Sequence, residues 1–379
     1  MKKSIRDLVP SFIRDIDPYV PGKPIEEVER ELHMRAVKLA SNENPLGPSP
    51  LAVEAARKAL AESNRYPDGS GFYLREKLAG RLGVPPANII LANGSTELID
   101  MTARSILRES EMGITAQGSF PMYTISIRAA GANLVETPLK DFTFDLDTIL
   151  SVITPATKLI FIANPNNPTG TMFTADEFER FLARVPDGLL VVLDEAYFEY
   201  VERPNYSRSI ELVRRGTNLL VLRTFSKVYG LAGLRIGYGI GPAELLAEMN
   251  KVRAPFNTSG VAQAAALAAL DDAEHVRRSV ESNRAGLAQL SRGLERMGVQ
   301  FVPSAANFLL VNFGGDAQIV ADELLRQGVI VRPMRWMGFP NAIRVTVGTK
   351  EENNRFLDAL AQMLAAEGGA HQSDPKVVR

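Results

Sequence analysis

Lys227 and Arg235 stand eight positions apart in the stretch RTFSKVYGLAGLRIGYGIG (residues 223–241), whose flanks read as buried strands. A lysine that is removed from water has a lowered pKa, which makes its amine a nucleophile for carbonyl groups. An arginine nearby can give a phosphate charge-assisted hydrogen bonds. The stretch therefore indicates a ligand with a carbonyl and an anionic group, although Lys227 alone would more often be a surface lysine.

Asp194 closes the apolar run LLVVL, so its carboxylate is expected to be substantially buried. A buried charge needs a partner, because without one it is neutralised. A helix cap or a salt bridge with a nearby arginine would satisfy Asp194, and so would a protonated nitrogen of a ligand. The aspartate alone leaves the structural and functional interpretations open.

Two loops carry an unusual set of small and amide residues. Gly94, Ser95 and Thr96 form a turn immediately before a predicted helix, where free N–H groups and the helix dipole suit a phosphate. Ordinary N-capping by Ser95 or Thr96 is the alternative. The second loop, NPNNPTG (residues 164–170), cannot be helical and predicts a fixed turn whose amide side chains face a ligand.

One ligand accounts for these four features together. Pyridoxal 5'-phosphate offers an aldehyde to the lysine, a ring nitrogen to the aspartate and a phosphate to the small residues and the arginine. A metal site is not expected, because the chain has no cysteine and its three histidines, His33, His275 and His371, show no ligand spacing.

The elements that must position these residues are short apolar runs alternating with helical patterns, which predict an α/β fold with a mostly parallel sheet covered on both faces. Ligands of such sheets bind at the carboxyl ends of the strands, where all four features fall. From about residue 262 long helices and a later strand set indicate a smaller α+β domain. The predicted divisions are an N-terminal arm (1–40), a large domain (41–260) and a small C-terminal domain (261–379).

The composition is that of an ordinary globular protein: 379 residues, 45% of them hydrophobic, with a net charge of -1. No basic stripe marks a nucleic-acid-binding surface, and no apolar run is long enough to span a membrane. The N-terminal MKKSIRDLVP lacks the apolar segment of a signal peptide. We therefore expect a cytoplasmic protein without nucleic-acid or membrane partners.

Motifs along nearly the whole chain, from IDPYVPGKP (16–24) through RYPDG, NGSTELI, NPNNPTG, DEAYFEY and RTFSKVYGLAGLRIGY to IRVTVGTKEEN (343–353), occur together in one family. On these residues the sequence resembles the fold-type I, aspartate-aminotransferase-like enzymes that depend on pyridoxal 5'-phosphate. Within them it is most similar to the histidinol-phosphate aminotransferases. The resemblance implies a large domain with a seven-stranded, mostly parallel sheet between helices, a smaller α+β domain and an N-terminal arm.

The resemblance also implies roles for single residues. Lys227 matches the lysine that forms the Schiff base and then acts as the general base, and Asp194 matches the aspartate that keeps the ring nitrogen protonated. Tyr66 matches a tyrosine that reaches the cofactor phosphate of a neighbouring subunit, which implies a homodimer. Asn167 and Tyr197 match the pair on the phenolic oxygen, and the phosphate-binding set is Gly94, Ser95, Thr96, Thr224, Ser226 and Arg235.

Two departures and four substrate residues complete the comparison with the family. Phe120 stands where a tyrosine often stacks on the cofactor ring, and Gln117 replaces a common proline. Arg344 matches the arginine that grips the substrate anion. The remaining substrate-side matches are Arg332 and Tyr19, around the substrate phosphate, and Asn42, on a segment that lines the pocket. Surface packing is the alternative for Arg332 and Tyr19.

The function implied is transfer of an amino group from L-histidinol phosphate to 2-oxoglutarate, in two half-reactions of histidine biosynthesis. An aromatic amino acid aminotransferase on the same scaffold remains an alternative, because imidazole and phenyl groups use similar pockets. A decarboxylase of the threonine-phosphate type and a non-catalytic, cofactor-binding regulator are further alternatives. The regulator usually needs a DNA-binding segment, and the first forty residues show no helix-turn-helix pattern.

Overall fold

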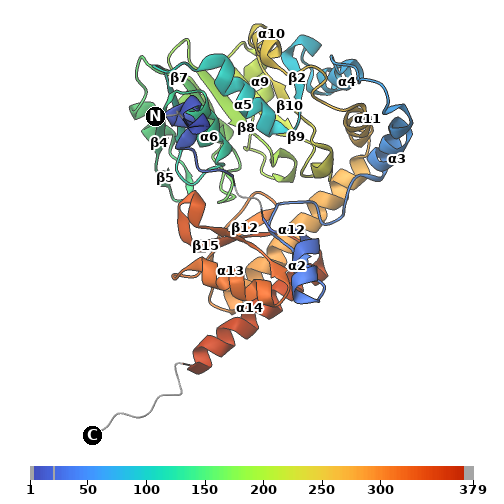
Figure 1. The fold of residues 1–379 in the computed structure, drawn as a ribbon, viewed down its shortest axis with the longest axis vertical. Coiled ribbons are helices and arrows are strands. Elements are labelled where there is room, and N and C mark those ends of the chain that lie inside the picture. The colour runs from blue at the N-terminus through green and yellow to red at the C-terminus, as the bar shows by residue number, and fades with distance from the viewer. Residues whose placement is uncertain (1–3, 20–21, 371–379) are drawn as a thin grey trace.

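The structure, a computed structural model, describes residues 4–19 and 22–370, with side chains described up to residue 366. These residues form a larger unit around one sheet and a smaller unit around another, with the long helix α12 (Ala273–Arg296) running between them (Figure 1). No helix of this described part is both long and apolar enough to cross a membrane.

The larger unit is built on a seven-stranded sheet in the order β2-β10-β9-β8-β7-β3-β4. Four neighbouring pairs are parallel, and only β10 runs antiparallel to both of its neighbours. The mostly parallel seven-stranded sheet expected from the sequence is thereby confirmed. The strands are β2 (Ile89–Ala92), β3 (Met112–Ala116), β4 (Asn133–Thr137), β7 (Thr157–Ala163), β8 (Leu190–Asp194), β9 (Leu219–Thr224) and β10 (Gly237–Ile240).

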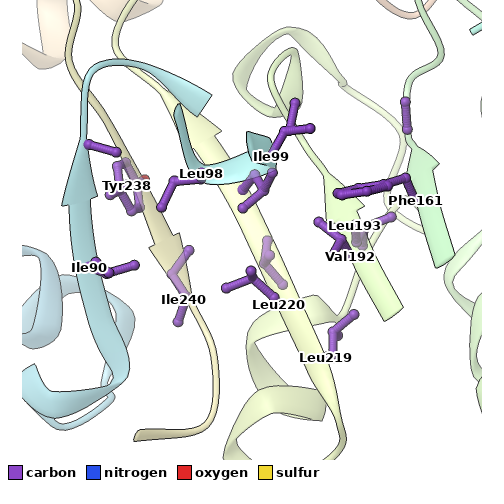
Figure 2. Packing of buried hydrophobic residues seen from close by; sticks show 14 of the residues in the cluster. Ile90, Leu98, Ile99, Phe161, Val192, Leu193, Leu219, Leu220, Tyr238 and Ile240 are labelled. Carbon is purple, nitrogen blue, oxygen red and sulfur yellow. The ribbon is translucent and has the colours of Figure 1, made fainter. Parts of the chain in front are cut away.

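Helices cover this sheet because each presents an apolar stripe to it. In α5 (Ser95–Ile106), Leu98 and Ile99 are fully buried over the strands, as Figure 2 shows, while Asp100 and Arg104 pair at 2.8 Å on the outer face. The other helices of the unit are α3 (Pro50–Ala59), α4 (Phe72–Leu82), α6 (Met122–Ala129), α7 (Leu146–Ser151), α8 (Ala175–Leu182), α9 (Ser209–Arg214) and α10 (Ala243–Val252). Gly83, in the left-handed conformation, ends α4 as its sequence predicts.

The smaller unit has an antiparallel four-stranded sheet in the order β11-β12-β15-β14. Its strands are β11 (Gln300–Val302), β12 (Phe308–Asn312), β14 (Arg332–Met334) and β15 (Phe339–Thr346), and α13 (Ala317–Arg326) and α14 (Lys350–Ala370) accompany α12. The domain boundary after residue 260 stays a prediction; α11 (Gly260–Ala269), which begins there, packs against α3 and α4 of the larger unit.

The N-terminal segment is more ordered than its prolines suggested. It contains α1 (Ser11–Arg14), which contacts α6, and α2 (Ile25–Leu32), which buries Val28 against Ala40 and Ile330. Apolar residues at 25, 28 and 32 have helical spacing and Pro24 precedes the first turn, so a helical signal was present. Strand β1 (Val37–Lys38) then pairs in parallel with β13 (Val329–Ile330), which ties this segment to the smaller unit.

Candidate active site

The carboxyl ends of β7, β8 and β9 and the start of α5 meet at one cavity of about 280 Å³. This is the edge of the sheet at which ligands of open α/β folds bind. The cavity is lined by most of the residues predicted from the sequence: Tyr19, Asn42, Ser95, Thr96, Phe120, Asn167, Asp194, Tyr197, Thr224, Ser226, Lys227, Arg235, Arg332 and Arg344.

Asp194 is buried at the end of β8 and is satisfied by hydrogen bonds rather than by a cation. Its Oδ2 accepts from the Tyr123 hydroxyl at 2.8 Å and its Oδ1 from the Ala196 N–H at 3.1 Å. The alternative of a salt bridge between Asp194 and an arginine is not observed among the residues that the structure describes. The neighbouring residue Glu195 forms one instead, accepting from Arg223 at 2.8 and 2.9 Å. Burial raises the pKa of Asp194 to about 6, so the site favours a ligand that brings a positive charge to this carboxylate.

Tyr123 was missed in the sequence, although it lies three residues after Phe120 at the start of α6. Its ring stacks on Phe161 at 5.2 Å between centroids, which fixes the hydroxyl toward Asp194. Burial raises the pKa of Tyr123 well above its ordinary value, so the hydroxyl keeps its proton and donates it. The only sequence signal was an aromatic residue in the first turn of the helix.

Lys227 follows β9 in a turn and is partly buried. Burial, together with the positive charges of Arg344 and Arg235, lowers its pKa to about 8, whereas Glu43 and Asp194 oppose the shift. The amine lies 5.5 Å from the centroid of the Tyr197 ring. A sizeable neutral fraction near neutral pH makes Lys227 a nucleophile and a base. Glu43, another lining residue absent from the prediction, also bonds Lys38 at 3.1 Å.

One end of the cavity is small and polar. Gly94, with φ +76°, stands at the N-cap of α5 and gives no side-chain cap, so the alternative of N-capping by Ser95 or Thr96 is not observed. A Cβ at Gly94 would lie 2.7 Å from Arg235 Nη2, which explains the need for glycine beside this arginine. Thr224 donates to Ser226 Oγ at 3.0 Å, and Arg235 Nη1 donates to the same oxygen at 3.5 Å. Hydroxyls, a guanidinium and an uncapped helix start suit a phosphate.

The asparagines of the 164–170 turn divide between scaffold and site. Asn164 exchanges two hydrogen bonds with the backbone of Phe173, both 3.1 Å long, and Asn166 accepts from Ser119 Oγ at 2.8 Å. Asn167 lines the cavity, and its Oδ1 accepts from Arg344 Nη1 at 2.5 Å. Because the oxygen is taken by a cation, the amide nitrogen of Asn167 remains as the donor for a ligand.

Asn42 supports Tyr197 at the wall of the cavity. Its Nδ2 donates to the Tyr197 hydroxyl oxygen at 2.9 Å, and its Oδ1 accepts from Thr346 Oγ1 at 3.1 Å. Burial raises the pKa of Tyr197 to about 12, so the hydroxyl stays protonated. With its oxygen already accepting from Asn42, Tyr197 is left with one proton to donate to an oxygen of a ligand.

A second end of the cavity is lined by two arginines, which lie on neighbouring strands of the smaller sheet. Arg332 of β14 and Arg344 of β15 are directly opposite each other, and both are buried. Arg344 donates to neutral acceptors, Asn167 and the Ala40 carbonyl, and forms no ion pair with any carboxylate in the described residues. Like charges opposite each other destabilise a sheet, so this end of the cavity favours an anion, and a doubly charged one most of all.

Two predicted residues do not line the cavity. Gly94 supports it from behind, next to Arg235, whereas Tyr66 is 82% exposed and stacks on Phe256 at 4.7 Å. No group of metal-ligating side chains occurs among the residues the structure describes, and His371 lies outside them.

The residues present fit pyridoxal 5'-phosphate. An acceptor for a protonated ring nitrogen (Asp194), an amine (Lys227), an aromatic ring (Phe120) and two donors (Asn167 and Tyr197) line the same cavity as the polar phosphate end. The phenylalanine at position 120 keeps the ring for stacking. These residues offer partners for the cofactor's ring nitrogen, phenolic oxygen and phosphate.

Comparison with known proteins shows the family of the chain. Residues 35–360 match the family model "Aminotransferase class I and II". The chain is 49% identical to histidinol-phosphate aminotransferase 1 of Nitrosococcus oceani, over 94% of this chain and 97% of the relative, and 49% identical to histidinol-phosphate aminotransferase of an Anaeromyxobacter species, over 95% and 100%. The crystal structure of histidinol-phosphate aminotransferase from Sinorhizobium meliloti in complex with pyridoxal-5'-phosphate superposes with a TM-score of 0.87 at 28% identity, covering 97% of this chain and 99% of that one.

Proposed function

Because this chain belongs to the class I and II aminotransferases, we propose that it transfers the amino group of L-histidinol phosphate to 2-oxoglutarate. The products are imidazole acetol phosphate and L-glutamate, and the reaction serves histidine biosynthesis. The enzyme is a pyridoxal 5'-phosphate-dependent aminotransferase, with an amino donor and a 2-oxo acid as its substrates.

The cofactor end of the cavity supports this chemistry. When bound, pyridoxal 5'-phosphate supplies an electron sink for the negative charge left at the α-carbon of the amino donor. Asp194 would hold the ring nitrogen protonated, Asn167 and Tyr197 would donate to the phenolic oxygen, and the polar end would bind the phosphate. Lys227 Nζ would take the proton from the α-carbon and deliver it to the cofactor carbon that receives the amino group, for which its pKa of about 8 leaves enough neutral amine.

The observation that carries the substrate proposal is the cross-strand pair Arg332 and Arg344. Both guanidinium groups line the cavity that also contains Lys227. L-Histidinol phosphate carries a phosphate dianion where an ordinary amino acid carries a single carboxylate charge. Two buried arginines match a dianion, and their planar forks suit its oxygens.

The alternatives receive less support. An aromatic amino acid donor would present one carboxylate to two arginines, and both relatives reported above are named histidinol-phosphate aminotransferases. A decarboxylase needs no 2-oxo acid, and a non-catalytic regulator would leave Lys227, Asp194 and Asn167 in one cavity without a reaction.

The homodimer belongs to the same proposal. Tyr66 and Phe256 stack at the surface, and Phe72 and Tyr73 at the start of α4 are 55% and 73% exposed, so the larger unit presents aromatic rings that a second copy would bury. On the dimer, Tyr66 would reach the cofactor phosphate of the neighbouring subunit. The cytoplasmic location expected from the sequence also remains a proposal.

Single half-reactions of the purified holoenzyme test the function. The visible absorbance of the bound cofactor should bleach quickly with L-histidinol phosphate and slowly with L-phenylalanine, and 2-oxoglutarate should restore it. Preferential bleaching by L-phenylalanine would identify an aromatic aminotransferase instead. Turnover without any 2-oxo acid, with release of carbon dioxide from a donor, would identify a decarboxylase.

A further inference from the structure

Trp336 is the single tryptophan of the chain and lies against the anion-binding end of the cavity. It stands on a 3-10 turn (Arg335–Met337) that directly follows β14, four residues after Arg332. The Arg332 guanidinium carbon lies 4.9 Å from the centroid of the indole ring. This distance is within the range of a cation–π interaction, for which tryptophan is the best aromatic partner.

The indole also contacts the N-terminal segment. The ring of Tyr19 packs edge-on against Trp336, with centroids 5.4 Å apart and an interplanar angle of 85°. Arg332 lies 5.7 Å from the centroid of the Tyr19 ring as well. The guanidinium is therefore held between two rings that come from opposite ends of the chain, and the rings hold each other.

The turn that carries Trp336 is fixed on both sides. Arg335 forms a 2.7 Å salt bridge with Asp316, the N-cap of α13, and Met337 is buried in the smaller unit. Gly338 closes the turn in the left-handed conformation, with φ +88°. The indole itself remains 43% exposed although it is large and apolar. The position of the indole is therefore set by the turn and by its contacts with Arg332 and Tyr19, not by burial in a hydrophobic core.

Trp336 does not line the cavity, whereas Arg332 and Tyr19 do. It can act on a bound substrate only through these two residues. A guanidinium held against a ring loses less freedom when it binds an anion, because its plane is already oriented.

We propose that Trp336 is a positioning residue: its indole orients the Arg332 guanidinium and the Tyr19 ring toward the phosphate of the amino donor, and thereby sets the preference for phosphorylated donors. The inference rests on the proposed function, because it concerns the substrate phosphate.

Two matched variants separate ring chemistry from bulk. Trp336→Phe keeps an aromatic face, and Trp336→Leu keeps an apolar side chain without one. L-Histidinol phosphate is compared with L-histidinol, which lacks only the phosphate, and Ile319→Ala on the exposed face of α13 serves as the control. In Trp336→Leu the KM for L-histidinol phosphate should rise about 10-fold. Its kcat and the constants for L-histidinol should change by less than about 3-fold, and Trp336→Phe should recover most of the loss.

Equal losses on both donors, or an unchanged KM for L-histidinol phosphate in Trp336→Leu, would overturn the inference. A wild-type enzyme that does not use L-histidinol phosphate would instead refute the proposed function, so the two failures are distinguishable.

A second readout does not depend on turnover. Because Trp336 is the only tryptophan, its fluorescence in the holoenzyme should change saturably as inorganic phosphate is added. Arg332→Gln should abolish that change. If the tryptophan fluorescence of the wild-type holoenzyme did not change when phosphate is added, the inference that Trp336 acts on the anion through Arg332 would be contradicted.

Discussion

The two ends of the cavity are built in different ways. The cofactor end comes from consecutive strand ends and loops of one sheet, between Gly94 and Arg235, and its side chains hydrogen-bond one another. The substrate end brings together Tyr19 near the N-terminus and Arg332 and Arg344 from the smaller sheet. In the proposed function, the first end performs the chemistry that every substrate needs, whereas the second decides which substrate is held. Mutations at the two ends should therefore have different kinetic signatures.

Lys227→Ala tests the cofactor end most severely. Removing the amine should lower kcat/KM by on the order of 10⁴-fold or more, to the same extent in both half-reactions, because no other group in the cavity can replace it. Stopped-flow half-reactions measure both values. Lys251→Ala, an exposed lysine on α10, is the control and should leave the rates unchanged. If the rate of Lys227→Ala were within tenfold of the wild-type rate, another group would have to act as the nucleophile and base.

Asp194→Asn should lower the rate of both half-reactions by on the order of 10³-fold, since a neutral amide cannot hold the ring nitrogen protonated. The cofactor should still bind, as measured by its absorbance after dialysis. Asp187→Asn, on an exposed loop, is the matched control. A loss confined to one half-reaction would show that Asp194 acts on a substrate rather than on the cofactor.

Arg332→Gln and Arg344→Gln should separate the donors at the substrate end. Arg332→Gln should lower the kcat/KM ratio of L-histidinol phosphate to L-histidinol by about 10²-fold, because a charge-assisted bond to a buried anion is lost. Arg344→Gln should also raise the KM for 2-oxoglutarate, because the Arg344 guanidinium is expected to bind the anionic group of either substrate. If the kcat/KM ratio of the two donors were the same in the wild type and in Arg332→Gln, the arginine end would not determine substrate choice.

A smaller effect is expected on the stability of the apoenzyme, because two buried groups at the cofactor end have shifted pKa values. Burial raises the pKa of Asp194 from 3.8 to about 6 and lowers that of Lys227 from 10.5 to about 8. Between about pH 4 and 6 the folded state holds a proton that the unfolded chain has lost, so the Asp194 contribution lowers stability as the pH rises. Between about pH 8 and 10.5 the unfolded chain holds the extra proton on Lys227, so stability rises with pH.

At pH 7 both charges therefore weaken the apoenzyme. Asp194→Asn and Lys227→Met should each stabilise it by on the order of 1 kcal/mol. Thermal unfolding of the apo variants, followed by circular dichroism between pH 5 and 9, measures this. Unchanged or lower melting temperatures would show that neither charge destabilises the folded apoenzyme.

Sequence reasoning worked best where chemistry lies within one continuous motif. The strand-end loops around Asn167, Asp194 and Lys227 each combine an apolar strand with a polar residue, and a parallel sheet brings such ends together whatever the details. Tyr123, Glu43 and Trp336 were missed because their role depends on which distant side chain they meet. The Arg332–Arg344 pairing required the register between β14 and β15, and no local pattern in the sequence specifies that register.

The hydrogen bonds of Arg344 have a consequence for how the two ends communicate. Arg344 belongs to the smaller sheet, yet it bonds Asn167 beside the cofactor and the Ala40 carbonyl at the end of the N-terminal segment. An anion that draws the guanidinium away from Asn167 would free the amide oxygen Oδ1 and loosen the orientation of this side chain, which the proposed function places at the cofactor's phenolic oxygen. By thermodynamic linkage, the factor by which the anion alters cofactor affinity equals the factor by which the cofactor alters anion affinity. With the proposed role of Asn167, the bond would therefore couple anion binding to cofactor binding.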